Sequence, residues 1–230
     1  MVQLYLKKPV KTKLLPVLPL ISVFVGLTIL SWVAWPIISF QLFYDPEAAK
    51  IITPLADDFI SQAEAEAAEI DLTKASNWFP NQPKKATDSP IDSYLLSLPK
   101  LRISNAIVRI GTDDLSKNLI HFGGSGIPGQ PGNAVIFGHS VLPVFYDPKN
   151  YLTIFSLLPT LKEKDDIYIR FDGVDYRYQV TDMKVTEPDD VSGLEQKYDD
   201  SYITLVTCVP PGTYLKRLWV TARLVPFDKK

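Results

Sequence analysis

The sequence predicts a mainly β domain, folded as a sandwich or barrel, that follows a single N-terminal apolar helix. No charged side chain occurs between Leu14 and Phe43, and about 20 apolar residues suffice to cross a bilayer. After Pro90 the chain consists of short strand-like runs separated by turn signals, the pattern of a sandwich or barrel. A length of 230 residues fits one domain plus an anchor. The net charge is −2 and no basic cluster occurs beyond the N-terminus. The sequence therefore lacks the basic patch that is typical of nucleic-acid-binding proteins.

The apolar stretch is expected to be an uncleaved transmembrane anchor over residues 18–43, behind a cytoplasmic tail of residues 1–17. A cleaved signal peptide is the alternative, but its apolar region is usually shorter, and no small-residue cleavage site follows the span. Lysines before the span favour a cytoplasmic N-terminus, and aromatic residues gather at its far end, as interfacial aromatics do. These residues are Lys7, Lys8, Lys11 and Lys13, and then Trp32, Trp35, Phe43 and Tyr44. We therefore expect a single-pass protein of the cell membrane whose C-terminal domain is extracytoplasmic.

Residues 44–97 are expected to form a helical stalk followed by a linker. Residues 63–69 are rich in strong helix formers but carry no wide apolar stripe, so this helix should be solvated. Pro80, Pro83 and Pro90 then fall among polar residues, which indicates a linker over residues 74–90.

Residues 98–230 are expected to form the β domain, with about seven or eight strands and one or two short helices. Asp172-Gly173 is a favoured hairpin dipeptide and should join two of the strands. Residues 152–161 have the apolar spacing of a helix, residues 123–132 form a glycine-rich loop, and residues 188–200 form an acidic loop. The strands that are expected cover residues 101–110, 134–137, 166–171, 176–184, 202–207 and 217–225.

Cys208 is the only cysteine of the chain, so it has no partner for an internal disulfide. Outside the cytoplasm, disulfides are the usual fate of cysteines, and an unpaired thiol is open to oxidation. Cys208 is therefore either a small buried hydrophobe or a thiol that is kept because it reacts. From this residue alone both interpretations stay open.

A cysteine nucleophile needs a nearby base or cation that supplies its thiolate. His139 follows the strand expected at residues 134–137, and Cys208 ends another strand, so the two meet if both strand ends share one rim. Arg217 begins a strand after the short turn at residues 210–212, and a hairpin would return its donors beside Cys208. A lone histidine in a β domain is more often structural, so spacing alone does not decide the matter.

Two segments resemble the sortase family. The run Thr204-Leu205-Val206-Thr207-Cys208, followed by Arg217, is similar to the sortase signature TLxTC with an arginine on the next strand. Residues 129–140 resemble the family's PGxxGNxVIxGH segment, which ends here in His139 and Ser140. The resemblance covers roughly residues 98–225.

This resemblance implies a closed eight-stranded β-barrel and a cysteine transpeptidase. Such an enzyme cleaves an LPXTG-like sorting signal through a thioacyl intermediate and passes the acyl group to an amine of a cell-wall precursor or a pilin subunit. Its partners would then be surface proteins or pilins that bear the signal. Cys208 would be the nucleophile, His139 the general acid/base and Arg217 the residue that steadies substrate or oxyanion. Val206, Thr207 and Pro210 would contact the substrate, and His121 would stand behind the site.

Several points depart from the family pattern or stay open. Pilin-polymerising sortases often carry an Asp-Pro-aromatic lid, whereas this chain has Asn77-Trp78-Phe79-Pro80, so the subclass is undecided. Some sortases bind calcium, but the loop that holds Glu187, Asp189, Asp190, Glu195, Asp199 and Asp200 is better explained as a solvated acidic loop, so we expect no metal or other cofactor. An L,D-transpeptidase would place its cysteine in an SHGC-like run, which is absent. The remaining alternative is a surface-anchored β domain that only binds a wall polymer or a partner protein.

Overall fold

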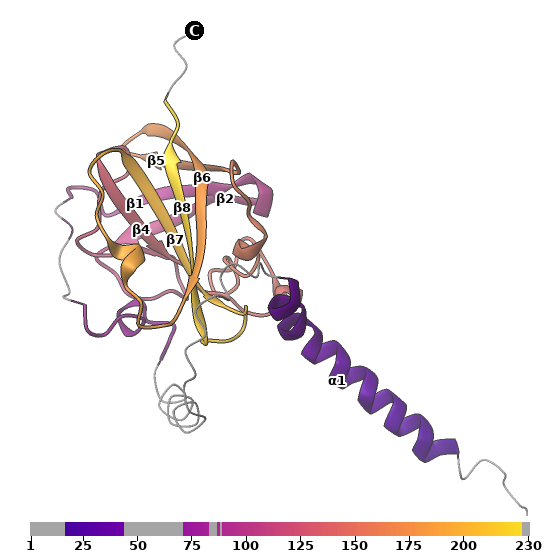
Figure 1. The fold of residues 1–230 in the computed structure, drawn as a ribbon. Helices are drawn as coiled ribbons and strands as arrows, with labels where there is room; N and C mark the ends of the chain where they lie inside the picture. The colour runs from indigo at the N-terminus through magenta and orange to yellow at the C-terminus, as the bar shows by residue number, and fades with distance from the viewer. Residues whose placement is uncertain (1–16, 44–70, 83–86, 88, 227–230) are drawn as a thin grey trace, which may run out of the picture. The chain divides into compact units, whose positions relative to one another are not determined.

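The computed structural model describes residues 17–43, 71–82, 87 and 89–226 (Figure 1). Two compact units divide the chain, residues 1–44 and residues 45–230. The expected stalk helix at residues 44–70 and the lysine-bearing tail lie outside the described residues.

Helix α1 (Val17–Phe43) is the described part of the first unit and spans 27 residues. A regular α-helix of this length is about 40 Å long. The described part of the chain contains no helix that combines the length and the apolar character needed to cross a bilayer. The transmembrane anchor expected at residues 18–43 therefore stays a prediction.

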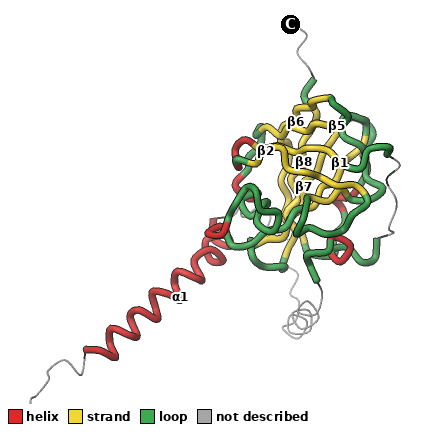
Figure 2. The backbone as a smooth tube through the Cα atoms, turned by 180° about the vertical axis from the view of Figure 1, so that it is seen from behind, coloured by secondary structure: helices red, strands yellow, loops and turns green. Residues whose placement is uncertain are grey.

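The second unit is a closed β-barrel of eight strands, as the family resemblance predicts. The strands are hydrogen-bonded around the barrel in the order β1-β2-β3-β4-β7-β8-β6-β5, and β1 closes the ring on β5. The pairs β2–β3 and β4–β7 are parallel, whereas the other pairs are antiparallel. Figures 1 and 2 show the strands from opposite sides. Their bounds are β1 (Ser93–Leu98), β2 (Ile103–Ile110), β3 (Leu119–His121), β4 (Gly132–Phe137), β5 (Asp166–Phe171), β6 (Val174–Thr186), β7 (Ser201–Val209) and β8 (Lys216–Leu224).

Strands β4 and β7 are buried on both faces, unlike β1 and β5. Along β1 and β5 every second residue is buried, as expected of strands with one face towards the barrel interior. Strand β4 is buried at every position, and β7 at every position except Tyr202. A parallel strand that is covered on both faces has this pattern. Something must therefore cover the outer face of β4 and β7.

The cover is a segment that the sequence interpretation assigned largely to a linker. Residues 71–82, named the strap here, bury Leu72, Ala75, Trp78 and Phe79 against the barrel. Prolines and polar residues suggest a linker by composition, but two adjacent aromatic side chains gain free energy by leaving water, at about 25 cal/mol for each Å² of apolar surface. The structure thus differs from the prediction at the start of the region 74–90, and β1 begins before the predicted domain boundary at residue 98.

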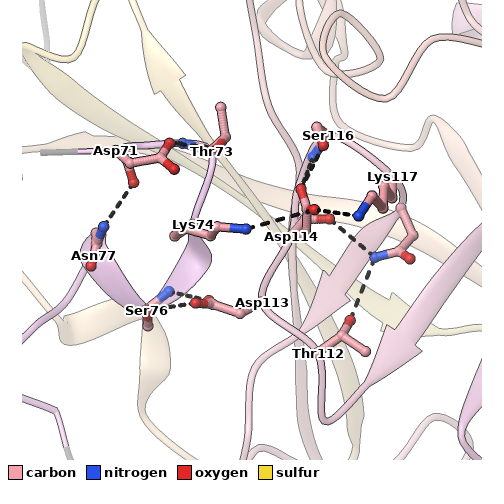
Figure 3. A network of polar contacts seen from close by, with 11 residues as sticks. Asp71, Thr73, Lys74, Ser76, Asn77, Thr112, Asp113, Asp114, Ser116 and Lys117 are labelled. Atoms are coloured by element: carbon pink, nitrogen blue, oxygen red, sulfur yellow. Dashed lines mark hydrogen bonds and ion pairs between the residues drawn. The ribbon is translucent and has the colours of Figure 1, made fainter.

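Polar contacts hold the strap to the loop of residues 111–118 (Figure 3). The Ala75 amide donates to the Asp113 carbonyl at 2.9 Å, and the Leu115 amide donates to the Thr73 carbonyl at 2.8 Å. The Ser76 hydroxyl donates to the Asp113 carboxylate at 2.6 Å. Lys74 pairs with Asp114 at 3.6 Å. These bonds fix where the strap lies, while its aromatic residues provide the buried contact.

The other expected elements have mixed outcomes. The hairpin at Asp172-Gly173 is confirmed, with both residues at positive φ, 50° and 73°, as a type I′ turn requires. The helix expected over residues 152–161 is wrong: this region consists of turns that end in a short 3₁₀ helix, Leu158–Thr160. Ile154, Phe155 and Leu158 are buried all the same, so their helix-like spacing reflects contact with the barrel.

Candidate active site

Cys208 and Arg217 face each other across two neighbouring strands. Strands β7 and β8 form an antiparallel hairpin in whose register Cys208 is the direct partner of Arg217. Both residues are buried, with 2% and 3% of their surface exposed. The guanidinium donates from Nη1 to the carbonyl of Tyr214 at 3.1 Å, but its buried Nε has no hydrogen-bond partner. A buried donor without a partner is costly, so this group is available to an acceptor that enters the site.

His139 reaches the same level of the barrel from strand β4. Strands β4 and β7 are parallel and pair Phe137 with Val206, so His139 and Cys208 each lie two residues beyond a matched pair. The backbone continues this alignment, because the Gly138 amide donates to the Val206 carbonyl at 3.1 Å. The structure therefore places Cys208 and Arg217 on β7 and β8, and His139 just beyond the end of the adjacent strand β4.

Two buried hydroxyls join the histidine and cysteine segments reciprocally. Thr207, just before the cysteine, donates to the carbonyl of Gly138, just before the histidine, at 2.8 Å. Ser140, just after the histidine, donates to the Cys208 carbonyl at 2.9 Å. Both side chains are almost fully buried, where such bonds are protected from competition by water. The strand ends are thereby held in register past the point where the sheet ladder stops.

The thiol is protonated at neutral pH in this arrangement. Burial raises the pKa of Cys208 from 9.0 to about 11, and the charge of Arg217 opposes this increase. The unfavourable desolvation of a thiolate outweighs its attraction to one guanidinium. Nucleophilic chemistry at Cys208 would thus require a base at the moment of attack, and the His139 segment is aligned with the cysteine strand.

The strap covers this end of the barrel. The ring of Trp78 stacks on Phe137 at a centroid distance of 5.4 Å, and the Arg217 guanidinium lies over the same Trp78 ring at 5.3 Å. Phe79 stacks on Trp219 at 5.5 Å. Cys208 belongs to the same buried cluster. The structure thus shows a closed site, in which an aromatic cover excludes solvent from the thiol.

Comparisons with known proteins identify the family. A family model described as a sortase domain matches residues 96–225. This chain belongs to the sortase family. Sortases are cysteine transpeptidases, and the match includes every strand from β2 to β8, together with Cys208, His139 and Arg217.

Individual relatives are more distant. Sortase D of Bacillus subtilis (strain 168) is 27% identical over 120 residues, which are 51% of this chain and 54% of the relative. The chain therefore spans about half the length of the curated relative it matches. Sortase A from Corynebacterium diphtheriae has a TM-score of 0.55 and 26% identity, with 77% of this chain and 88% of that chain covered. The pilus-related sortase C of Group B Streptococcus has a TM-score of 0.53 and 27% identity, with 82% and 97% covered.

The hydrogen bonds of His121 involve neither Cys208 nor Arg217. In this sortase its Nδ1 is 2.9 Å from the Tyr94 hydroxyl, and its Nε2 is 3.1 Å from the Ser125 hydroxyl. Burial lowers the pKa of His121 to about 4, so the ring is neutral at pH 7. Both nitrogens are used in holding β1 to the loop after β3, and the predicted role behind the site stays a prediction.

The residues predicted to contact substrate are all buried here. Val206 lies in the cluster that the strap covers, the Thr207 hydroxyl is bonded to Gly138, and Pro210 follows the cysteine strand in the turn to β8. Their roles toward a substrate stay predictions. The sequence interpretation missed Trp78 and Ser140 as parts of the site. An aromatic pair inside a polar stretch was the available signal for Trp78, whereas Ser140 gave none beyond its place after His139.

Three of the six acidic residues of the loop before β7 form ion pairs. Asp190 pairs with Lys184 at 3.5 Å, Glu187 with Lys216 at 3.2 Å and Asp200 with Arg223 at 2.5 Å. Over the described ranges, no three His, Cys, Asp or Glu side chains are grouped so as to hold a metal ion.

Proposed function

We propose that this sortase is a membrane-anchored transpeptidase that cleaves an LPXTG-like sorting signal through a thioacyl enzyme. The acyl group then passes to an amine of a cell-wall precursor or of a pilin subunit. The observation that carries the proposal is the direct pairing of Cys208 with Arg217 across β7 and β8, with His139 two residues beyond the end of the adjacent parallel strand β4.

The first half-reaction forms the thioester. His139 takes the Cys208 proton as the sulfur attacks the carbonyl carbon of the Thr–Gly bond, and the carbonyl oxygen becomes an oxyanion. The N–H donors of Arg217 stabilise this negative charge. One such donor typically raises the rate by about 10²–10³-fold. The imidazolium then gives its proton to the leaving amine as the C–N bond breaks. A protonated resting thiol fits this sequence, because its proton moves only during attack.

The second half-reaction transfers the acyl group. An incoming amine attacks the thioester carbonyl carbon and His139 accepts the proton from this amine. As the C–S bond breaks, the imidazolium passes this proton to the departing sulfur, which regenerates the Cys208 thiol. The thioester retains much of the free energy of the cleaved peptide bond, so no nucleotide is needed outside the cytoplasm. A membrane anchor would keep the enzyme beside both substrates and raise their effective concentration.

The strap must move before either step. The Trp78 ring packs against the Phe137 ring and the Arg217 guanidinium. The Cys208 side chain is nearly inaccessible to solvent in this state. A substrate carbonyl can reach the free Arg217 Nε only after the indole has left. The closed site is thus the resting state of the proposed enzyme.

The test uses the full chain in detergent with a library of fluorescence-quenched sorting peptides and a glycine-rich peptide as the amine. We expect cleavage, an acyl-enzyme mass on Cys208 and a ligated product, all absent from Cys208→Ala. Equal turnover by Cys208→Ala would overturn the nucleophile assignment. A chain that never forms an acyl-enzyme with any library member would favour the binding-domain alternative.

A further inference from the structure

We propose that the turn formed by residues 147–156 is the orienting element of His139, and that Thr153 is its principal positioning residue. In this assignment the turn fixes the Nδ1–H tautomer of His139 and leaves Nε2 as the atom that exchanges the proton with Cys208 and with the amines. The kinetic part of the inference rests on the proposed function, whereas the tautomer can be measured without it.

The tautomer follows from a single hydrogen bond. His139 Nδ1 lies 2.7 Å from the carbonyl oxygen of Leu152. A carbonyl can only accept, so the hydrogen belongs to Nδ1 and the neutral ring has its lone pair on Nε2. Within the described residues, no carboxylate or amide side chain bonds to this ring. A backbone carbonyl therefore takes the part that a carboxylate or amide plays in other nucleophile–histidine sites.

The Thr153 hydroxyl braces the turn that carries this carbonyl. It accepts a hydrogen bond from the Asp147 amide at 3.0 Å and donates to the Asp147 carbonyl at 2.9 Å. These two hydrogen bonds join Asp147, at the start of the turn, to Thr153, near its end. The Asn150 carboxamide oxygen accepts from the Leu152 amide at 3.0 Å. Thr153 is 7% exposed, so water competes little for its hydroxyl.

The far end of the same turn is fastened to the histidine segment. The Phe155 amide donates to the His139 carbonyl at 3.1 Å, and the buried Ser156 hydroxyl accepts from the Val141 amide at 2.9 Å. The Phe155 ring lies so close to Gly138 that an added Cβ there would be 2.3 Å from it. The turn thus holds both the imidazole and the backbone that carries it.

The arrangement also favours the imidazolium that forms during attack. When Nε2 takes the Cys208 proton, the bond from Nδ1–H to the Leu152 carbonyl becomes charge-assisted and strengthens. A neutral carbonyl gives less stabilisation than a carboxylate would. The turn therefore contributes mainly when the proton moves.

His121 provides an internal reference with the opposite tautomer. The Ser125 hydroxyl donates its one hydrogen to the Phe122 carbonyl at 2.7 Å. It can therefore only accept from His121, so the hydrogen of His121 is on Nε2 and its Nδ1 accepts from Tyr94. The chain has two histidines, and the geometry assigns them opposite tautomers.

The decisive experiment is long-range ¹H–¹⁵N NMR on the full chain with ¹⁵N-labelled histidine in detergent at pH 8, where His139→Ala identifies each signal. We expect an Nδ1–H pattern for His139 and an Nε2–H pattern for His121. An Nε2–H pattern for His139 in the folded wild-type chain would overturn the inference. This measurement needs no substrate, so its outcome is separate from that of the proposed function.

Two matched variants then test Thr153. Thr153→Val keeps the shape and removes the hydroxyl, whereas Thr153→Ser keeps the hydroxyl. We expect Thr153→Val to lower kcat for peptide cleavage by about 10- to 100-fold with little change in KM, since misplacing a catalytic group by 1 Å can cost about 10²-fold. The His139 spectrum should become a mixture of tautomers, and Thr153→Ser should restore both. Wild-type kcat and tautomer in Thr153→Val would refute the role of Thr153. If Thr153→Val does not fold, Thr153→Ala takes its place in the same two measurements, and the wild-type spectrum still decides the tautomer of His139.

Discussion

Replacing Trp78 with alanine should open the closed site. The indole stacks on Phe137, lies against Arg217 and donates from Nε1 to the Leu72 carbonyl at 2.8 Å. A buried Trp→Ala change typically costs about 3–5 kcal/mol. The ion pair of Lys74 with Asp114 at the strap is partly exposed and contributes at most about 1 kcal/mol. The aromatic contact therefore contributes more to strap closure than this ion pair does.

The size of the effect follows from these numbers. A loss of 3 kcal/mol shifts the closed–open equilibrium by about 10²-fold, because about 1.4 kcal/mol corresponds to a factor of ten. Cys208 is the only thiol, so iodoacetamide alkylation followed by mass spectrometry reports the open fraction directly. We expect the alkylation rate to rise about a hundredfold at pH 8, and to level off where the strap is mostly open.

A matched control separates this effect from general loosening of the barrel. Tyr168→Ala removes an aromatic ring that is 39% exposed on β5, and alkylation should stay within about twofold of the wild type, as expected of a surface substitution. If Trp78→Ala folds and its Cys208 reacts no faster than that control, the strap does not limit access and the reasoning fails.

Three other outcomes are expected. His139→Ala should lower sorting-peptide cleavage by about 10²–10⁴-fold and Arg217→Ala by about 10²–10³-fold, with only partial recovery in Arg217→Lys because lysine lacks the planar fork; full activity in either alanine variant would contradict its role. Because the pKa of Cys208 is raised in the folded state, the protonated thiol contributes to the free energy of unfolding below pH 9, and this contribution is lost as the pH rises towards 11. It amounts to about 3 kcal/mol. Urea denaturation at pH 7 and 10.5 should therefore show a larger fall in the free energy of unfolding for wild type than for Cys208→Ala. Protease added to intact protoplasts should remove the barrel and spare an N-terminal tag, and a protected barrel would refute the expected topology.

The sequence predicted the strands that carry their own signals. Strands β5 and β6 are alternating runs around Asp172-Gly173, and β7 and β8 are rich in apolar and β-branched residues. Strand β3 has only three residues, and the strands on either side of it, not its own composition, determine its conformation. The turn at residues 152–161 looked helical because barrel contact imposes an apolar spacing of its own.

The site divides in the same way. Cys208, His139 and Arg217 stand out because of their chemistry and the turns beside them. Trp78 and Ser140 make contacts with residues far away in the chain, as the 2.9 Å bond from Ser140 to the Cys208 carbonyl illustrates. Such contacts exist only once β4 and β7 are aligned. Local sequence patterns therefore cannot specify them.

Access and ionisation of the thiol are coupled in this site. Burial is the main cause of the raised pKa of Cys208, and the strap supplies part of that burial, since Trp78 and Cys208 belong to one cluster. When the strap leaves, water reaches the sulfur while Arg217 remains opposite it. The unfavourable desolvation of the thiolate then falls and the attraction to the guanidinium is retained, so the pKa should move down from about 11. The pH dependence of alkylation in Trp78→Ala should therefore have a lower midpoint than in wild type as well as a faster rate. An unchanged midpoint would mean that the barrel alone, without the strap, desolvates the thiol.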